Sequence, residues 1–252
     1  GANYKNYSKP VDYVINTGVI TKAPLTVTAN NDVKLIGQND TDGYAGASFS
    51  GFVNSETETV LSGTLTINRN NTNEASGSYL DVLVPSGLVA DNYDFIYING
   101  DFEILQADQL LVKFKKIIKN YGEIPVYELI SSQYVNSNTG NTLLDLTSST
   151  TVTGGQVIVT DGSTTTGFTI GAKNPTYSTS NNLNVGNYEL SASEISLSNN
   201  INSLKIVGNY KVNPLALTVS VGEVNKEYDG TKEIGNIQLN LASPIIDDNV
   251  TV

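Results

Sequence analysis

Apolar and polar residues alternate along most of this chain, in short runs separated by Gly, Asn, Ser and Thr. Strict alternation gives a β-strand one apolar and one polar face. Helical periodicity is weak. The one helical signal is the Ser-x-x-Glu spacing of Ser55 and Glu58 ahead of Val60, which is typical of a capping box and predicts one or two helical turns. The pattern therefore predicts a mostly β protein.

One hydrophobic plan recurs along the chain and indicates internal repeats. In each copy an alternating strand leads into a Gly-containing turn. A second strand follows, and a short Ala- or Pro-containing joint then precedes Leu-x-Val. The copies cover residues 11–29, 93–114 and 204–221, and their turns lie at 16–18, 99–100 and 208–209.

The turn at Asn99-Gly100 carries a specific expectation. Asn-Gly between alternating runs is typical of a type I′ hairpin, because both central residues of that turn need a positive φ. We therefore expect residues 93–98 and 101–105 to be antiparallel neighbours.

The Leu-x-Val positions set the length of the repeat. Leu25 and Leu110 are 85 residues apart (110 − 25), and Leu110 and Leu217 are 107 apart (217 − 110). Both spacings suit one small β domain, and the longer one implies an insertion within residues 132–182, where 156–160 and 167–170 are predicted strands. We expect a closing hairpin of a preceding module over 1–23, a β module over 24–106, a second module with an insertion over 107–213, and the start of a different module over 214–252.

The joints between the predicted modules are only two to five residues long and are not Gly/Ser-rich linkers. The expected fold class is thus mostly β, with small antiparallel modules arranged end to end in an elongated rod. Each module is interpreted as a β-sandwich of immunoglobulin-like type or as a β-grasp-like sheet, and the residues do not decide between them.

The composition excludes several kinds of chemistry. The chain has no His and no Cys, so it cannot form a Ser–His or Cys–His nucleophile pair or a zinc, haem or iron–sulfur site with the usual ligands. A glycosidase needs only two carboxylates, but Trp is also absent and nothing indicates an aromatic-lined cleft. We therefore expect no enzyme, no catalytic residues and no cofactor other than an oxygen-liganded cation such as Ca²⁺.

The charge of the chain bears on its partners. The net charge is −11, which disfavours nucleic acid as a partner. The one basic cluster is interpreted as a solvated strand face or a charged edge that discourages pairing, with an anion-binding patch as the alternative. No apolar run approaches the roughly 20 residues that span a bilayer. The cluster consists of Lys113, Lys115, Lys116 and Lys119.

Two kinds of site are candidates on the surface. Asp40 and Asp42 lie two residues apart before Gly43, so a Ca²⁺ site is one interpretation and an Asx-rich surface turn is the other. Asn39 and Asn70 each begin an Asn-x-Thr acceptor and are candidates for glycosylation.

Several motifs resemble a known family. The steps GFVNSETETVLSGTLTI (51–67) and VPSGLVADNYDFIYINGDFEI (84–104) resemble MBG-type modules (YGX-like) of filamentous-haemagglutinin-like bacterial surface adhesins. Residues 120–122 and 184–188 are similar to the Tyr-Gly and Asn-Val-Gly-x-Tyr steps of that family. VNKEYDGTKE (224–233), with residues 247–250, resembles the companion YDG-type module.

The resemblance implies export, a place in a repetitive stalk on a Gram-negative cell surface, and a role in cell adhesion or biofilm. Neighbouring repeats of the same chain are then the expected partners. The alternative hypothesis is an adhesive module that binds a host or microbial glycan or protein, with or without Ca²⁺.

Overall fold

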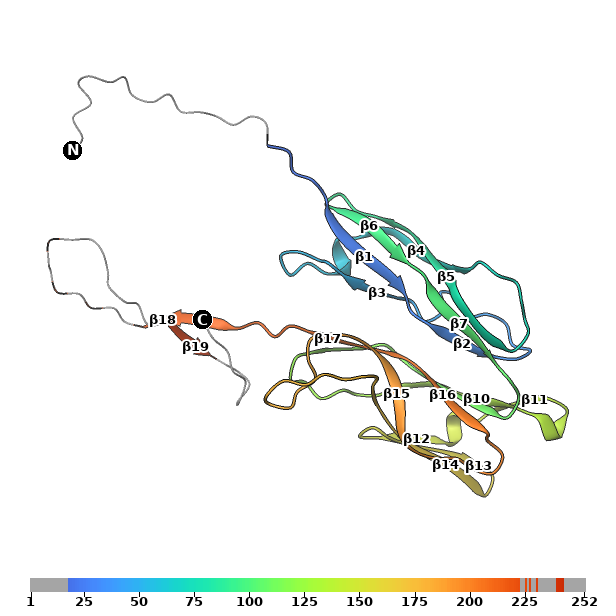
Figure 1. Ribbon diagram of the computed structural model, residues 1–252. Coiled ribbons are helices and arrows are strands. Elements are labelled where there is room, and N and C mark those ends of the chain that lie inside the picture. Colours follow the sequence, from blue (N-terminus) through green and yellow to red (C-terminus); the bar gives the residue numbers. More distant parts are fainter. Residues whose placement is uncertain (1–17, 223–224, 226, 228–229, 231–238, 243–252) are drawn as a thin grey trace.

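The computed structural model describes residues 18–222, 225, 227, 230 and 239–242, and Figure 1 shows it as two β modules lying side by side. The predicted mostly β fold is confirmed, because strands form most of the described residues. In that part of the chain the only helices are three-residue 3₁₀ turns, η1 (Glu58–Val60), η2 (Ser137–Thr139) and η3 (Thr147–Ser149).

The predicted helical signal is confirmed only as the single turn η1. Its N-cap is Thr57 rather than Ser55, because the Thr57 side chain accepts the bond from the Thr59 amide. Ser55 has φ +60°, outside the helical region.

The first module is a two-layer structure. Its sheets have the strand orders β3-β1-β6 and β2-β7-β5-β4. Alternate side chains of both layers meet in one core that includes Leu25, Val27, Leu83, Tyr93 and Phe102. The strands are β1 (Ala23–Ala29), β2 (Asp32–Leu35), β3 (Ala47–Ser50), β4 (Ser62–Arg69), β5 (Gly77–Val89), β6 (Tyr93–Ile98) and β7 (Gly100–Leu105).

Two ribbons, β1–β2 and β6–β7, pass from one layer to the other and lie parallel along their whole length. β1 pairs with β6 and β2 pairs with β7, both in parallel. The predicted antiparallel hairpin of β6 with β7 is therefore wrong, and the sheets are mixed rather than purely antiparallel.

The Asn99-Gly100 step shows why the hairpin prediction failed. Neither residue has a positive φ, so the chain does not turn there. Gly100 is needed for a close approach instead, since a Cβ on it would lie 2.6 Å from the carbonyl oxygen of Ala29.

The second module repeats this plan with an insertion. Its sheets have the orders β11-β10-β8-β16 and β12-β13-β14-β15-β17-β9. Parallel ribbons again pair β8 with β16 and β9 with β17. The strands are β8 (Gln109–Phe114), β9 (Ile117–Asn120), β10 (Leu129–Asn136), β11 (Thr142–Asp145), β12 (Thr150–Thr153), β13 (Gln156–Asp161), β14 (Thr164–Ala172), β15 (Gly186–Ser196), β16 (Ser203–Val207) and β17 (Asn209–Asn213).

The neighbours of each strand establish the correspondence between the modules. The order β10-β8-β16 matches β3-β1-β6, and β9-β17-β15-β14 matches β2-β7-β5-β4. Strands β11, β12 and β13 have no counterpart in the first module. They extend the edges of the second module's two sheets. The predicted strands over 156–160 and 167–170 are confirmed within β13 and β14.

The second module has its own core, centred on residues such as Leu110, Val112, Tyr134 and Phe168. After it the chain reaches β18 (Thr218–Val221), which pairs with β19 (Leu239–Ala242). Two predictions lie largely outside the described residues. They are the YDG-type module over 214–252 and, apart from Gly18, the hairpin turn at 16–18.

Candidate functional site

The feature of this molecule with most bearing on function is the junction between its two modules. β7 ends at Leu105 and β8 begins at Gln109, so the joint comprises only residues 106–108. The predicted short joint is therefore present, and its geometry decides how one module sits on the next.

Asp108 holds this joint in place. It has φ +62°, a left-handed conformation that Asp tolerates better than most residues. Its backbone N–H donates to the Val135 carbonyl at 2.7 Å and its carbonyl accepts from the Asn202 amide at 2.7 Å. Its carboxylate accepts from the amide and hydroxyl of Ser137 at 2.9 and 2.5 Å. The joint is thus bonded to the second module rather than being a flexible linker.

The modules also share a small apolar cluster beside the joint. β2 and β7 of the first module supply one side, and β8, β10 and β16 of the second supply the other. Each of these side chains is at most 8% exposed, so the contact is dry. The cluster consists of Val33, Leu35, Leu105, Leu111, Val135 and Val207.

Polar contacts extend the junction away from the joint. Lys113 donates to Asp32, which is 3% exposed, at 2.7 Å. Lys205 forms an ion pair with Glu103. The Lys113–Asp32 pair is largely buried and fixes the register of the two surfaces, because removing Lys113 would leave the buried Asp32 charge unpaired. The Lys205–Glu103 pair is 43% and 29% exposed and contributes less.

The order of these contacts shows how the chain runs. Leu111, Lys113 and Lys116 follow one another along the second module. Their partners in the first module are, in the same order, Leu105, Asp32 and the carbonyl of Ala47, which lie progressively further from the joint. The second module therefore runs back alongside the first, as Figure 1 shows. The predicted end-to-end rod is not confirmed, because the left-handed turn at the joint reverses the chain.

The basic cluster takes a different role from the predicted one. Lys113 lies in the junction, and Lys116 donates to the Ala47 carbonyl at 3.2 Å and lies 3.5 Å from Glu58. Lys115, exposed and paired with Glu128, fits the predicted solvated face, and Lys119 is half-buried on β9. The missed signal was the repeat itself, since the equivalent of Lys113 in the first module is the uncharged Thr28.

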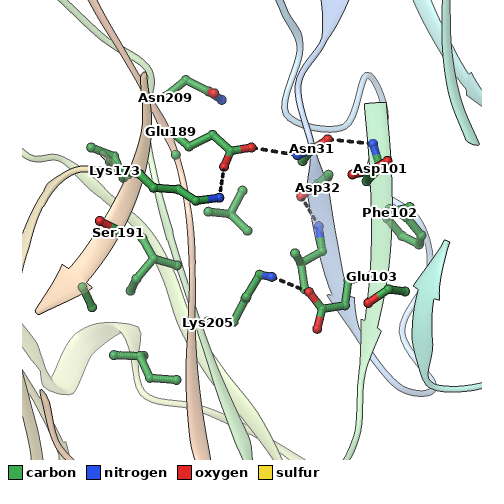
Figure 2. A pocket seen from close by; sticks show the side chains of 18 of the residues that line it. Asn31, Asp32, Asp101, Phe102, Glu103, Lys173, Glu189, Ser191, Lys205 and Asn209 are labelled. Carbon is green, nitrogen blue, oxygen red and sulfur yellow. Dashed lines mark hydrogen bonds and ion pairs between the residues drawn. The ribbon is translucent and has the colours of Figure 1, made fainter. Parts of the chain in front are cut away.

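A groove of about 410 Å³ lies between the modules, and Figure 2 shows it from close by. Asn31 of the first module donates to Glu189 of the second at 2.7 Å, and Lys173 donates to the other oxygen of Glu189 at 2.7 Å. Leu80 and Ile195, which are 71% and 49% exposed, add apolar surface.

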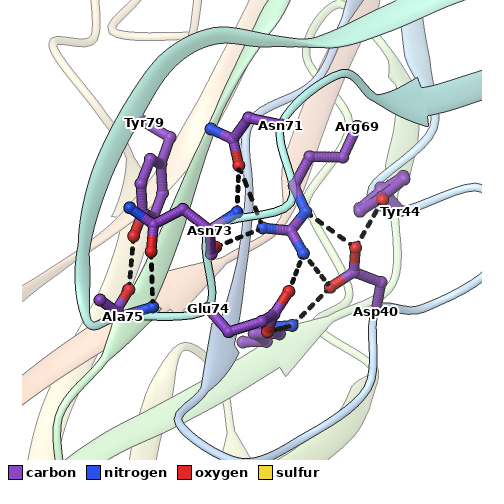
Figure 3. A network of polar contacts seen from close by, with 9 residues as sticks. Asp40, Tyr44, Arg69, Asn71, Asn73, Glu74, Ala75 and Tyr79 are labelled. Carbon is purple, nitrogen blue, oxygen red and sulfur yellow. Dashed lines mark hydrogen bonds and ion pairs between the residues drawn. The ribbon is translucent and has the colours of Figure 1, made fainter.

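A second polar cluster lies inside the first module, around Arg69 (Figure 3). Arg69 Nε donates to Asp40 at 2.9 Å, and Lys34 Nζ donates to the same carboxylate at 2.6 Å. Glu74 bonds to both cations, and the Arg69 guanidinium lies 4.9 Å from the Phe102 ring centroid. Both cationic side chains are 6% exposed, so the cluster compensates two buried charges.

The predicted Ca²⁺ residues are separated by this arrangement. Asp40 is bonded to Lys34, Arg69 and Tyr44, whereas Asp42 is exposed. Burial alone would raise the pKa of Asp40, but the hydrogen bonds from Lys34, Tyr44 and Arg69 lower it below its ordinary value. In the described residues no group of three or more acidic, His or Cys side chains could hold a metal. The Ca²⁺ site stays a prediction.

The predicted glycosylation sites are both exposed. Asn70 follows β4 at the surface, and Asn39 lies in the loop after β2, at the rim of a second groove between the modules. Modification of either residue stays a prediction.

Within the described part of the chain, no helix combines the length and apolar character needed to cross a membrane.

Comparison with known proteins identifies the first module. Neither a curated protein nor a solved structure matches the chain. The YDG-type resemblance stays a prediction. Residues 25–103, from the start of the first module to β7, match the family model of the MBG domain (YGX type), which confirms over these residues the predicted resemblance to MBG-type modules.

Proposed function

We propose that this chain is a repeat region of a secreted bacterial adhesin, where it acts as a stiff spacer on the outer surface of a Gram-negative cell. The modules occupy 24–106 and 107–213, and 214–252 begins a further module of YDG type. The junction at Asp108 carries the proposal, because a spacer transmits position only if its repeats cannot swing freely.

The direction of the chain changes how such a spacer would grow. Because the second module runs back along the first, repeats would stack side by side, and the long axis of the array would lie across the strands. Each added module would then extend the array by about the thickness of a two-layer sandwich, in which the sheets are roughly 10 Å apart, plus its side chains. Nearest-neighbour contacts would supply the stiffness, as in other linear repeat proteins.

A second candidate function is adhesive binding of a glycan or protein ligand in the groove of Figure 2. This candidate is favoured because exposed Leu80 and Ile195 lie beside the charged Lys173 and Glu189 there. This site uses residues of both modules, so it would exist only while the junction is intact. In either case we expect no catalytic activity.

A binding assay separates the two candidates. The full chain, immobilised, is probed with a glycan array and with bacterial and host cells, with and without a Ca²⁺ chelator. The spacer role predicts no specific retention. Retention that a Leu80→Asp variant abolishes, while the surface variant Ile158→Asp does not, would replace the spacer role with groove binding.

A further inference from the structure

The same face is buried in the second module and largely exposed in the first. In the second module, the outer face of β8 and β16 is covered by the first module, and Leu111 and Val207 are 3% and 8% exposed. In the first module, the equivalent face of β1 and β6 is covered only at one border, where Thr28 and Ser48 line a groove with Asn187 of the second module. Its Ile96 and Ile98 are 50% and 46% exposed.

Strand register makes this equivalence specific. Leu111 pairs with Lys205 and Lys113 with Val207 in the second module. Thr26 pairs with Ile96 and Thr28 with Ile98 in the first. Counted from Leu25 and Leu110, Ile98 therefore occupies the place of Val207 and Ile96 that of Lys205.

Each module can use two opposite faces for such contacts. The ribbons cross from one layer to the other, so Leu25 and Phe102 both point into the core although they lie on different sheets. Phe95 pairs with Leu25 and also packs on the core. Ile96, which follows Phe95, and Glu103, which follows Phe102, then lie on opposite sides of the sandwich, because side chains alternate along a strand. A face that binds the following module and an opposite face that binds the preceding one form a heterologous contact, which can repeat without closing.

The segment before the first module has the matching sequence. Ile20 lies five residues before Leu25, as Leu105 lies five before Leu110. Leu105 is 3% exposed in the shared cluster, whereas Ile20 is 100% exposed. An apolar residue thus recurs at the position that the junction buries.

The charges change together at the same two sites. Glu103, which pairs with Lys205, is replaced by Gly18 in the preceding segment, and Lys205 is replaced by Ile96 on the receiving face. Both positions are therefore uncharged where the known junction has an ion pair, so the two surfaces are compatible.

We propose that the outer face of β1 and β6, with Ile96 and Ile98 at its centre, is the docking surface for a preceding module of the same kind. The faces in contact are those that join the first module to the second, without the Asp108 clamp, whose place Ala23 takes. Residues 18–20, which form no strand in this structure, would be the end of that module's closing strand, and Ile20 would enter the contact. The inference rests on the proposed spacer function and names its repeating interface.

The test uses a chain extended by one module, in which a second copy of residues 24–102 replaces residues 1–17 directly before Gly18. The chain has no Cys, so one introduced thiol reports one site. Thiol labelling rates of Ile98→Cys are compared between the original and the extended chain. Ile158→Cys, 46% exposed on β13, is the matched control, and Val207→Cys reports the known junction.

The proposal expects labelling of Ile98→Cys to slow about tenfold or more in the extended chain, as burial in a stable contact requires, while Ile158→Cys is unchanged. Adding Gly18→Glu, which sets an unpaired carboxylate against Ile96, should restore fast labelling. Unchanged labelling of Ile98→Cys beside a folded copy overturns the proposal. A copy that fails to fold also counts against it, because docking should stabilise the copy. If Val207→Cys labels rapidly as well, the spacer function itself fails.

Discussion

The two modules share one strand plan but fill the same place in it differently. In the first, the β4 residue paired with Leu83 is Arg69, which lies beside Phe102. In the second, the β14 residue paired with Leu190 is Ala172. The frame comes from alternation and strand pairing. Individual residues determine what fills the interior. The buried Arg69 is compatible with the first module because Asp40 and Glu74 pair with it.

The largest effect tests the sameness of the modules. Leu25→Ala and Leu110→Ala remove equivalent side chains that are both 0% exposed. Each should lower the free energy of unfolding by about 3 kcal/mol, through lost burial and a cavity. Chemical denaturation measures the loss, and peptide-level hydrogen exchange should locate it in the module that carries the substitution. Equal loosening of both modules by either variant would show that they are not separate cores.

A pair of glycine variants tests where the modules differ. A Cβ on Gly100 would lie 2.6 Å from the backbone oxygen of Ala29, which cannot move alone. A Cβ on Gly208 would lie 2.6 Å from the tip of the Leu190 side chain, which can rotate. Gly100→Ala should therefore cost about 2–3 kcal/mol and Gly208→Ala about 1 kcal/mol. Denaturation midpoints check the order, and a reversed order would refute the close-approach role of Gly100.

The smallest effect concerns the Arg69 cluster and depends on pH. Hydrogen bonds from Lys34 and Arg69 lower the pKa of Glu74, and the pKa of Asp40 is lowered as well, against burial. A lowered pKa contributes stability above the unfolded value, near 4, that is lost as pH falls through the folded value.

Arg69→Met should thus cost about 2 kcal/mol at neutral pH, and the difference from the unchanged chain should shrink as pH falls below about 4. Urea unfolding across pH measures this. The control Lys115→Met removes only an exposed pair with Glu128 and should change nothing measurable at either pH. A difference that stays constant with pH would contradict the ionic account of the cluster.

These comparisons also show what the residues alone could predict. Alternation located β1, β8, β13 and β14, because a half-buried strand leaves a period of two in the sequence. It could not show which strands become neighbours. Asn99-Gly100 therefore predicted a hairpin, although Gly100 is required by the backbone of β1.

The candidate site was harder to foresee for the same reason. Asp40 was a candidate for Ca²⁺ binding or for an Asx-rich turn, but it is bonded to Arg69, which is 29 residues away in the sequence. The junction depends on Asp108 and Lys113. The positive φ of Asp108 is visible only in the structure, whereas Lys113 differs in the sequence from Thr28, its equivalent in the first module. A charge that differs between repeats was the available clue to an interface.

The measurement that tests the central claim most directly is the distance distribution between the two modules in the full chain. Spin labels are attached to Val89→Cys in the first module and Ile158→Cys in the second, both at exposed positions. Pulsed electron paramagnetic resonance then measures the distance between them. A junction clamped at Asp108 and by the Asp32–Lys113 pair predicts one narrow distance, broadened by Lys113→Met. A broad or multiple distribution in the otherwise unchanged chain would contradict a fixed junction and, with it, the spacer function.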